Sequence, residues 1–252
     1  SLAERVHAIK PSATLTIAAK AKAMSLAGEN VLNLSAGEPD FNTPSHIIQA
    51  ATIAMQEGHT RYTPVGGSAA LKEAIIHKFQ TDNQLSYQAD EIIISTGAKQ
   101  SLSHAMLALL NPGDEVLIPA PYWVSYPDMA RLAGATPTIM PTTESQGFKI
   151  TPEQLQAAIT PKTRMLLINS PSNPSGSVYS HQELQALGTV LEQHPQVLVV
   201  SDDIYEHILF DDQKFYNLVN TCPNLKDQCV VVNGMSKSFA MTGWRIGFAA
   251  AP

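Results

Sequence analysis

The chain has few cysteines and no run of basic residues. Cys222 and Cys229 are the two cysteines in 252 residues, and no CxxC pair lies near them, so the sequence predicts reduced structural thiols and no metal or redox site. The 16 Lys and Arg residues are scattered along the chain and are outnumbered by 22 Asp and Glu residues, which gives a formal charge of −6. This charge pattern argues against nucleic acid as a partner.

Long apolar segments are also missing. No apolar run approaches the roughly 18 residues of a membrane helix, and the first residues lack the apolar stretch of a secretory signal. We therefore expect a cytoplasmic protein with no membrane partner.

Seven short apolar runs alternate with helical-looking segments from residue 91 onward, which is typical of an α/β fold. Several runs are apolar at consecutive positions, as expected for strands covered by helices on both faces of a parallel sheet. We expect a three-layer α/β/α fold with a mostly parallel sheet. Its strands should lie near residues 91–96, 114–119, 136–140, 164–170, 197–202, 229–234 and 245–251. The last two runs are close to the minimum separation for a parallel crossover, so the seventh strand is expected to be antiparallel.

The first 40 residues have a different pattern. A helix is expected over about residues 12–28, ending at Gly28, and the segment that follows leads into the main domain. We expect residues 1–40 to form an N-terminal arm and the start of a small domain, and residues 41–252 to form the large domain.

Polar and small residues follow the predicted strands. Ligands of an open parallel sheet bind outside the carboxyl ends of its strands, so we expect these residues to form one site. The stretches in question are residues 96–99, 122–123, 169–176, 202–205 and 234–237.

Lys237 lies in an uncharged Gly/Ser loop after a predicted strand, a position that is unusual for a solvated surface lysine. A free lysine near its reference pKa of roughly 10.4 is almost wholly protonated at neutral pH and is a poor nucleophile. Catalytic lysines are therefore kept in neutralised or partly desolvated surroundings. Arg245 follows nearby in the chain and would lower the pKa of Lys237, so we expect a reactive amine here.

Arg245 and the turn Gly97-Ala98 are candidates for binding an anion. The turn precedes a predicted helix, whose free N–H groups and dipole favour an anion, although such turns also connect strands to helices without any ligand. Arg245 lies in an apolar, glycine-flanked context, where its charge needs an anionic partner. A bidentate phosphate contact or an internal carboxylate would satisfy it, and for a lone arginine the internal salt bridge is the commoner outcome.

Five stretches together resemble one protein family. In chain order they are YTPVGGSAALKEAI, PYWVSYP, NSPSNPSG, SDDIYEH and SKSFAMTGWRIG. They are similar to the fold-type-I aminotransferases that use pyridoxal 5'-phosphate, and most of all to bacterial aspartate aminotransferases of subgroup Ib. The likeness covers essentially the whole chain and implies a large domain of the pyridoxal-phosphate transferase type.

The resemblance implies how the chain holds this cofactor. Lys237 would form the Schiff base with the cofactor aldehyde. The phosphate would be held by Arg245, Ser236 and the turn Gly97, Ala98 and Lys99.

The resemblance also implies contacts to the cofactor ring. Asp202 would pair with the pyridine nitrogen, because the spacing D-x-x-Y then gives Tyr205 the family position near the ring oxygen. A buried anion there keeps the nitrogen protonated and makes the ring an electron sink. Asp203 is expected to be either a surface carboxylate or one that contacts the site residues without touching the ligand. Asn173 would bond the ring oxygen and Trp123 would stack on the ring.

Further implied contacts concern the substrate and a second subunit. Gly37, together with Trp123 and Asn173, would contact the substrate. Tyr62 would reach the phosphate of the neighbouring subunit, which implies a homodimer with shared active sites. Ser175 stands where the family usually has Thr and keeps the hydroxyl.

The implied activity is transfer of an amino group between an amino acid, by default aspartate, and 2-oxoglutarate. Lys237, Asp202 and Tyr205 would be its catalytic residues. Alternatives that share Lys237, Asp202 and Arg245 are a carbon-sulfur lyase, a cyclopropane-carboxylate synthase and a non-catalytic cofactor-binding module. Family members continue into a C-terminal small domain that binds the substrate carboxylate, so we expect this chain to be a fragment without that domain.

Overall fold

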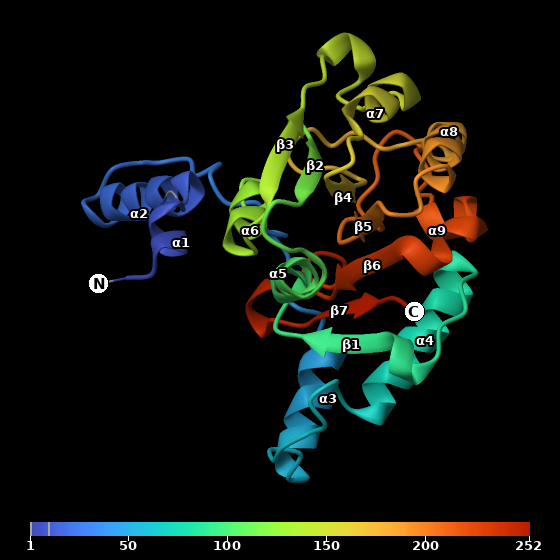
Figure 1. Cartoon of the computed structure of the whole chain (residues 1–252). Helices are drawn as coiled ribbons and strands as arrows, with labels where there is room; N and C mark the ends of the chain where they lie inside the picture. The colour runs from blue at the N-terminus through green and yellow to red at the C-terminus, as the bar shows by residue number, and fades with distance from the viewer. Residues whose placement is uncertain (1, 10) are drawn as a thin grey trace.

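A seven-stranded sheet forms the centre of the computed structural model, which describes residues 2–9 and 11–252. Its order is β1-β7-β6-β5-β4-β2-β3 (Figure 1). The strands are β1 (Ile92–Ser95), β2 (Glu115–Pro119), β3 (Thr136–Met140), β4 (Thr163–Asn169), β5 (Leu198–Asp202), β6 (Cys229–Gly234) and β7 (Gly247–Ala250). Six of the seven lie within the runs predicted from the sequence, and β4 begins one residue before its run.

Only β7 runs against its neighbours in this sheet, and the remaining pairs are parallel. The segment between β6 and β7 contains the short 3-10 helix η4 (Thr242–Trp244) and no crossover helix. A parallel connection needs such a crossover, so β7 returns alongside β6 in the opposite direction. The expected antiparallel seventh strand is confirmed.

Helices cover both faces of the sheet, as expected. Successive residues of one strand contribute to different hydrophobic clusters: Val199 of β5 belongs to one cluster and Val200 to the other. The first cluster includes residues of α4 (Ala69–Asn83), α8 (His181–Glu192) and α9 (Leu218–Thr221), and also Leu155 of α7 (Pro152–Ala158). The second includes residues of α5 (Ala98–Leu109) and α6 (Tyr126–Leu132). Two buried faces explain why the strands are apolar at consecutive positions.

The short 3-10 helices lie in the connections. They are η1 (Ala89–Glu91), η2 (Glu144–Gln146) and η3 (Pro223–Gln228).

The N-terminal part contains α1 (Glu4–His7), α2 (Ala13–Leu26) and α3 (Ser45–Gln56), and none of these helical residues is buried. Figure 1 shows α1 and α2, in dark blue, to one side of the sheet. Ser12 caps α2 by accepting a hydrogen bond from the Leu15 N–H, and Gly28 follows the helix with a φ of +87°. Positive φ favours glycine, so the predicted helix end at Gly28 is confirmed.

Across residues 2–9 and 11–252, no helix combines the length and the apolar character needed to cross a membrane.

Candidate active site

The carboxyl ends of β4, β5 and β6 gather the polar residues that the sequence singles out. Asn169, the last residue of β4, is paired in register with Asp202, the last residue of β5. The Asn169 side-chain amide donates to the Asp202 carbonyl at 2.9 Å, and its oxygen accepts from the Asn173 N–H at 2.8 Å. Asn169 therefore fixes two predicted site residues, and the sequence analysis did not assign it a role.

Asp202 is a buried carboxylate, 3% exposed. It accepts hydrogen bonds from the Tyr126 hydroxyl at 2.6 Å and from the Ile204 N–H at 3.3 Å. No cationic side chain among the described residues forms an ion pair with it. Burial raises the pKa of Asp202 to about 6, against the opposing effect of the Tyr126 hydrogen bond. Such a group is suited to bind a positively charged or proton-donating ring atom.

Asp203 is also buried, so of its two expected positions the one at the surface is excluded. It accepts hydrogen bonds from the Ser201 hydroxyl at 2.8 Å and from the Asn217 amide at 2.6 Å. Burial is the largest cause that raises the pKa of Asp203 to about 8, and the charge of Glu206 adds to it. These partners separate Asp203 from the Tyr126 hydroxyl that binds Asp202.

Tyr205 and Asn173 meet at the same edge of the sheet. The Asn173 amide donates to the Tyr205 hydroxyl at 3.3 Å, which links the loop after β4 to the loop after β5. Burial raises the pKa of Tyr205, and the Asp202 charge raises it further. Tyr205 therefore stays protonated at neutral pH and can donate a hydrogen bond to a ligand.

Lys237 points toward the same group. Its Nζ atom lies 5.8 Å from the centre of the Tyr205 ring and donates a hydrogen bond to the Gly37 carbonyl at 2.6 Å. Burial is the main cause that lowers the pKa of Lys237; Glu38 acts in the opposite direction and Arg245 lowers the pKa further. The direction expected from Arg245 is thus present, although desolvation contributes more. A lowered pKa increases the fraction of neutral, nucleophilic amine.

Arg245 lies against the turn before α5. A Cβ atom added to Gly97 would come within 2.4 Å of the Arg245 Nη2 atom, and one added to Gly247 would come within 2.2 Å of the Ala98 nitrogen. Gly97 also has a φ of +79°, a conformation that favours glycine. Gly97 therefore leaves room for the guanidinium at the start of α5, and Gly247 allows β7 to lie against the same turn.

No carboxylate of residues 2–9 and 11–252 forms an ion pair with Arg245, whose recorded partner is the Thr242 carbonyl at 2.9 Å. The internal salt bridge, the commoner outcome for a lone arginine, is therefore absent from this part of the chain. Ser236, 8% exposed, lies in the neighbouring loop. Together with the helix N-terminus, the guanidinium forms a cradle suited to a phosphate.

Two aromatic residues follow β2. Trp123 packs edge to face on Tyr126, with ring centres 5.4 Å apart, and the Lys99 Nζ lies 5.1 Å from the centre of the Trp123 ring. Tyr126 therefore links the two residues, because it packs against Trp123 and donates a hydrogen bond to the Asp202 carboxylate. Tyr126 lies within the PYWVSYP stretch, which was the available signal for its role.

Tyr62 does not join this group within the chain. Its side chain is fully exposed, so a contact with another subunit stays a prediction. Gly37, in contrast, is brought to the site by its hydrogen bond with Lys237.

The N-terminal segment is tied to the lysine loop by further contacts that the sequence did not indicate. The Thr242 hydroxyl donates to Glu38 at 2.9 Å, and the Trp244 ring N–H donates to the Thr43 hydroxyl at 3.0 Å. These contacts hold Gly37 beside Lys237.

One group of possible metal ligands lies elsewhere in the described structure. It consists of Asp82, Glu206 and His207. The Lys78 ammonium already forms ion pairs with both carboxylates of this group. A protein cation thus takes the place that a metal ion would need.

Several proteins of known function are similar to this chain. Residues 29–252 match the model of the family described as aminotransferase class I and II. The chain is 55% identical over 251 residues to an aspartate/prephenate aminotransferase of Nitrosomonas europaea and 54% identical over 251 residues to an aspartate aminotransferase of Geobacillus stearothermophilus. All of the chain is covered in both cases, but the chain spans only 63% and 64% of the lengths of these relatives.

Solved structures of aspartate aminotransferases are similar to this chain as well. An aspartate aminotransferase from Rhizobium meliloti superposes with a TM-score of 0.96 at 49% identity, and one from Thermus thermophilus with maleate superposes with a TM-score of 0.96 at 43% identity. Each comparison covers 100% of this chain, with 63% and 65% of the other chain. The chain therefore belongs to the aminotransferase class I and II family.

Proposed function

We propose that the protein transfers an amino group from an amino acid, with aspartate as the preferred donor, to 2-oxoglutarate. The family depends on pyridoxal 5'-phosphate. The observation that carries the proposal is the buried Asp202 carboxylate, which has no cationic partner among the described residues and lies at the same sheet edge as Lys237.

The residues of this edge fit the cofactor in three ways. The buried Asp202 carboxylate can accept the proton-bearing pyridine nitrogen, which would supply the cation that its burial requires. The cradle of Arg245, Ser236 and the start of α5 suits the phosphate, and the absence of Cβ atoms at Gly97 and Gly247 keeps the cradle compact. The Lys237 amine suits the aldehyde, because its lowered pKa favours the neutral form.

Each residue of the site would have a separate role toward the cofactor. Pyridoxal phosphate, when bound, supplies a sink for the electron pair left at the substrate α-carbon. Asp202, oriented by Tyr126, holds the proton on the ring nitrogen. Asn173 and Tyr205 provide the hydrogen bonds for the ring oxygen, and Trp123 provides an aromatic face for the ring.

Lys237 acts as the acid and base of the reaction. The Lys237 amine would take the proton from the substrate α-carbon and, as an ammonium group, would later give that proton up again. A positioned group of this kind contributes about 10²- to 10⁴-fold to the rate. The Gly37 carbonyl accepts a hydrogen bond from the Lys237 amine at 2.6 Å, which keeps this amine at the edge of the sheet.

The choice of substrate is supported by the relatives. Their names specify aspartate and, in one case, prephenate, and the Thermus thermophilus structure is one with maleate, a dicarboxylate. These names favour transamination over the lyase and synthase alternatives and favour a donor with two carboxylates.

A half-reaction with aspartate tests this function. We expect the full protein, loaded with cofactor and without a 2-oxo acid, to release about one equivalent of oxaloacetate per site and no ammonia. Adding 2-oxoglutarate should restore the absorbance that the bound cofactor had before aspartate was added. Prephenate should be compared with 2-oxoglutarate as a second amino acceptor. Absence of oxaloacetate from aspartate, together with release of ammonia and pyruvate from an amino acid that carries a sulfur leaving group, would indicate lyase chemistry and contradict the proposal.

We also propose that residues 1–40 act as an arm on a large cofactor-binding domain of residues 41–252, and that the protein is a homodimer. The unburied helices α1 and α2 support the first point. The fully exposed Tyr62 side chain supports the second, because the resemblance gives it a contact in the partner's site. The two free, buried cysteines support a reducing compartment such as the cytoplasm.

Subunit mixing tests the shared site. Tyr62→Phe and Lys237→Ala subunits of the full protein are each expected to form weak or inactive homodimers. In a mixed dimer both lesions can fall in one site and leave the other intact, so activity should appear on mixing. If subunit exchange is demonstrated and no activity appears, Tyr62 acts within its own subunit.

A further inference from the structure

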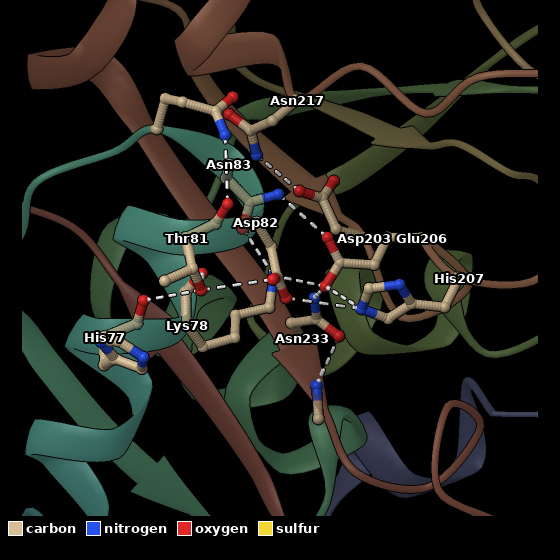
Figure 2. A network of polar contacts seen from close by, with 12 residues as sticks. His77, Lys78, Thr81, Asp82, Asn83, Asp203, Glu206, His207, Asn217 and Asn233 are labelled. Atoms are coloured by element: carbon tan, nitrogen blue, oxygen red, sulfur yellow. Dashed lines mark hydrogen bonds and ion pairs between the residues drawn. The ribbon is translucent and has the colours of Figure 1, made fainter.

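A buried polar network lies behind the candidate active site, between α4 and the ends of β5 and β6 (Figure 2). Its centre is Glu206, which is 4% exposed. Its carboxylate accepts a hydrogen bond from the Asn83 amide at 3.0 Å and another from the Asn233 amide at 2.8 Å. It also forms an ion pair with Lys78. A buried carboxylate with this many partners is held in one position.

The two asparagines can each satisfy Glu206 in one orientation. The Asn83 side-chain oxygen accepts from the Lys78 ammonium, while its amide donates to Glu206. The Asn233 side-chain oxygen accepts from the Gly234 N–H at 2.7 Å, while its amide donates to Glu206. Rotating either side-chain amide by half a turn would place its NH2 group against another hydrogen-bond donor, so the orientation of both asparagines is fixed. The side chain that lies between them must therefore accept a hydrogen bond from each. A carboxylate meets this requirement, whereas a glutamine would bring a donor of its own.

This network ends at the segment that carries the reactive lysine. Asn233 belongs to β6, and Lys237 follows four residues later. Gly234 is paired with Gly247 of β7, and the Met235 N–H donates to the Ile246 carbonyl at 3.1 Å. Gly234 leaves little space, because an added Cβ would lie 2.8 Å from the Ile246 carbonyl oxygen. The start of the lysine loop is therefore fixed by Asn233 on one side and by β7 on the other.

Glu206 is also adjacent in sequence to Tyr205. The turn after β5 is closed by the Glu206 N–H, which donates to the Asp203 carbonyl at 2.9 Å. Tyr205 lies toward Asn173 and Lys237, while Glu206 joins the network with α4. One side chain thus connects the two segments that carry Tyr205 and Lys237.

We propose that Glu206 is a positioning residue for Lys237, acting through Asn233 and anchored on α4 by its ion pair with Lys78, which Asn83→Ala would leave in place. The inference rests on the proposed function, because it assigns Glu206 to the geometry of the amine that binds the cofactor. Glu206 holds the end of β6 so that the Lys237 amine stays partly desolvated and close to Tyr205. Loss of this anchor lets the loop move and exposes the amine to water.

The test compares three variants of the full protein: Glu206→Gln, Asn233→Ala and, as a matched control, Asn83→Ala. The first two break the link to β6, and the third removes a Glu206 partner on the α4 side only. Two readouts are used: the affinity for pyridoxal phosphate by absorbance titration, and the rate at which an acylating reagent labels Lys237 in cofactor-free protein. The exposed Lys162 in the same sample serves as the internal reference.

Glu206→Gln and Asn233→Ala are each expected to weaken cofactor binding about tenfold, since small displacements of a positioned group are costly. They are also expected to slow labelling of Lys237 relative to Lys162 by about threefold at neutral pH, because a hydrated amine is more protonated. Asn83→Ala should lower the melting temperature by several degrees and leave both readouts as in the unmodified protein. If Glu206→Gln does not fold, Asn233→Ala decides the matter by itself.

Two results would overturn the inference: wild-type values in a folded Asn233→Ala variant, or an equal change in Asn83→Ala, which would indicate general loosening. Failure of the proposed function would look different, because then the unmodified protein itself would not capture the cofactor on Lys237. The labelling comparison would still report on Glu206 in that case.

Discussion

Replacing Lys237 by alanine is expected to abolish the aspartate half-reaction and to weaken the hold on pyridoxal phosphate. The variant loses both the covalent attachment point and the group that moves the proton, so the rate should fall by at least about 10²- to 10⁴-fold. Oxaloacetate release in a single turnover measures the first effect, and absorbance titration with the cofactor measures the second.

Lys149→Ala is a suitable control for this experiment. Lys149 is also partly buried, but its Nζ is already paired with Glu183 at 2.8 Å. The control should keep the full half-reaction rate. A Lys237→Ala protein that still converts aspartate at the normal rate would mean that another amine does the work.

Replacing Asp202 by asparagine should leave cofactor binding largely intact and slow proton removal severely. Asparagine keeps the shape but removes the charge that holds the proton on the ring nitrogen, and it keeps only one of the two oxygens that accept hydrogen bonds from Tyr126 and Ile204. Each unit of pKa corresponds to about 1.4 kcal/mol, so a loss of several units on the ring nitrogen would cost about 10²- to 10⁴-fold in rate. Stopped-flow absorbance with aspartate separates this step from binding.

Asp203→Asn is the matched control, one residue away and equally buried. Burial raises the pKa of Asp203 more than that of Asp202, so replacing Asp203 is expected to remove less charge at neutral pH. The pKa of Asp202 is raised only to about 6, so Asp202 is mostly charged at the same pH. A larger loss of activity in Asp203→Asn than in Asp202→Asn would show that the D-x-x-Y register has been misread.

The sheet could be predicted from the sequence because its strands carry a local signal. Val199 and Val200 face opposite hydrophobic layers, and runs of this kind mark a strand buried on both sides. The short connection before β7 likewise determines its direction. The ends of these strands then indicate where Asp202 and Lys237 lie, since ligand sites form at the carboxyl edge of such sheets.

Other features depend on contacts between distant segments and could not be predicted. Tyr126 reaches Asp202 across 76 positions of the sequence, and Asn83 reaches Glu206 across 123. The sequence left open whether Asp203 lies at the surface, because charged residues are seldom buried without partners. Its partners, Ser201 and Asn217, become visible only once the chain has folded.

The central claim is that Lys237 carries the cofactor. Borohydride reduction of the full protein loaded with pyridoxal phosphate, followed by peptide mapping, tests it most directly. The account predicts the pyridoxyl group on Lys237. A pyridoxyl group on Lys99 or on any other lysine, with Lys237 unmodified, would contradict it.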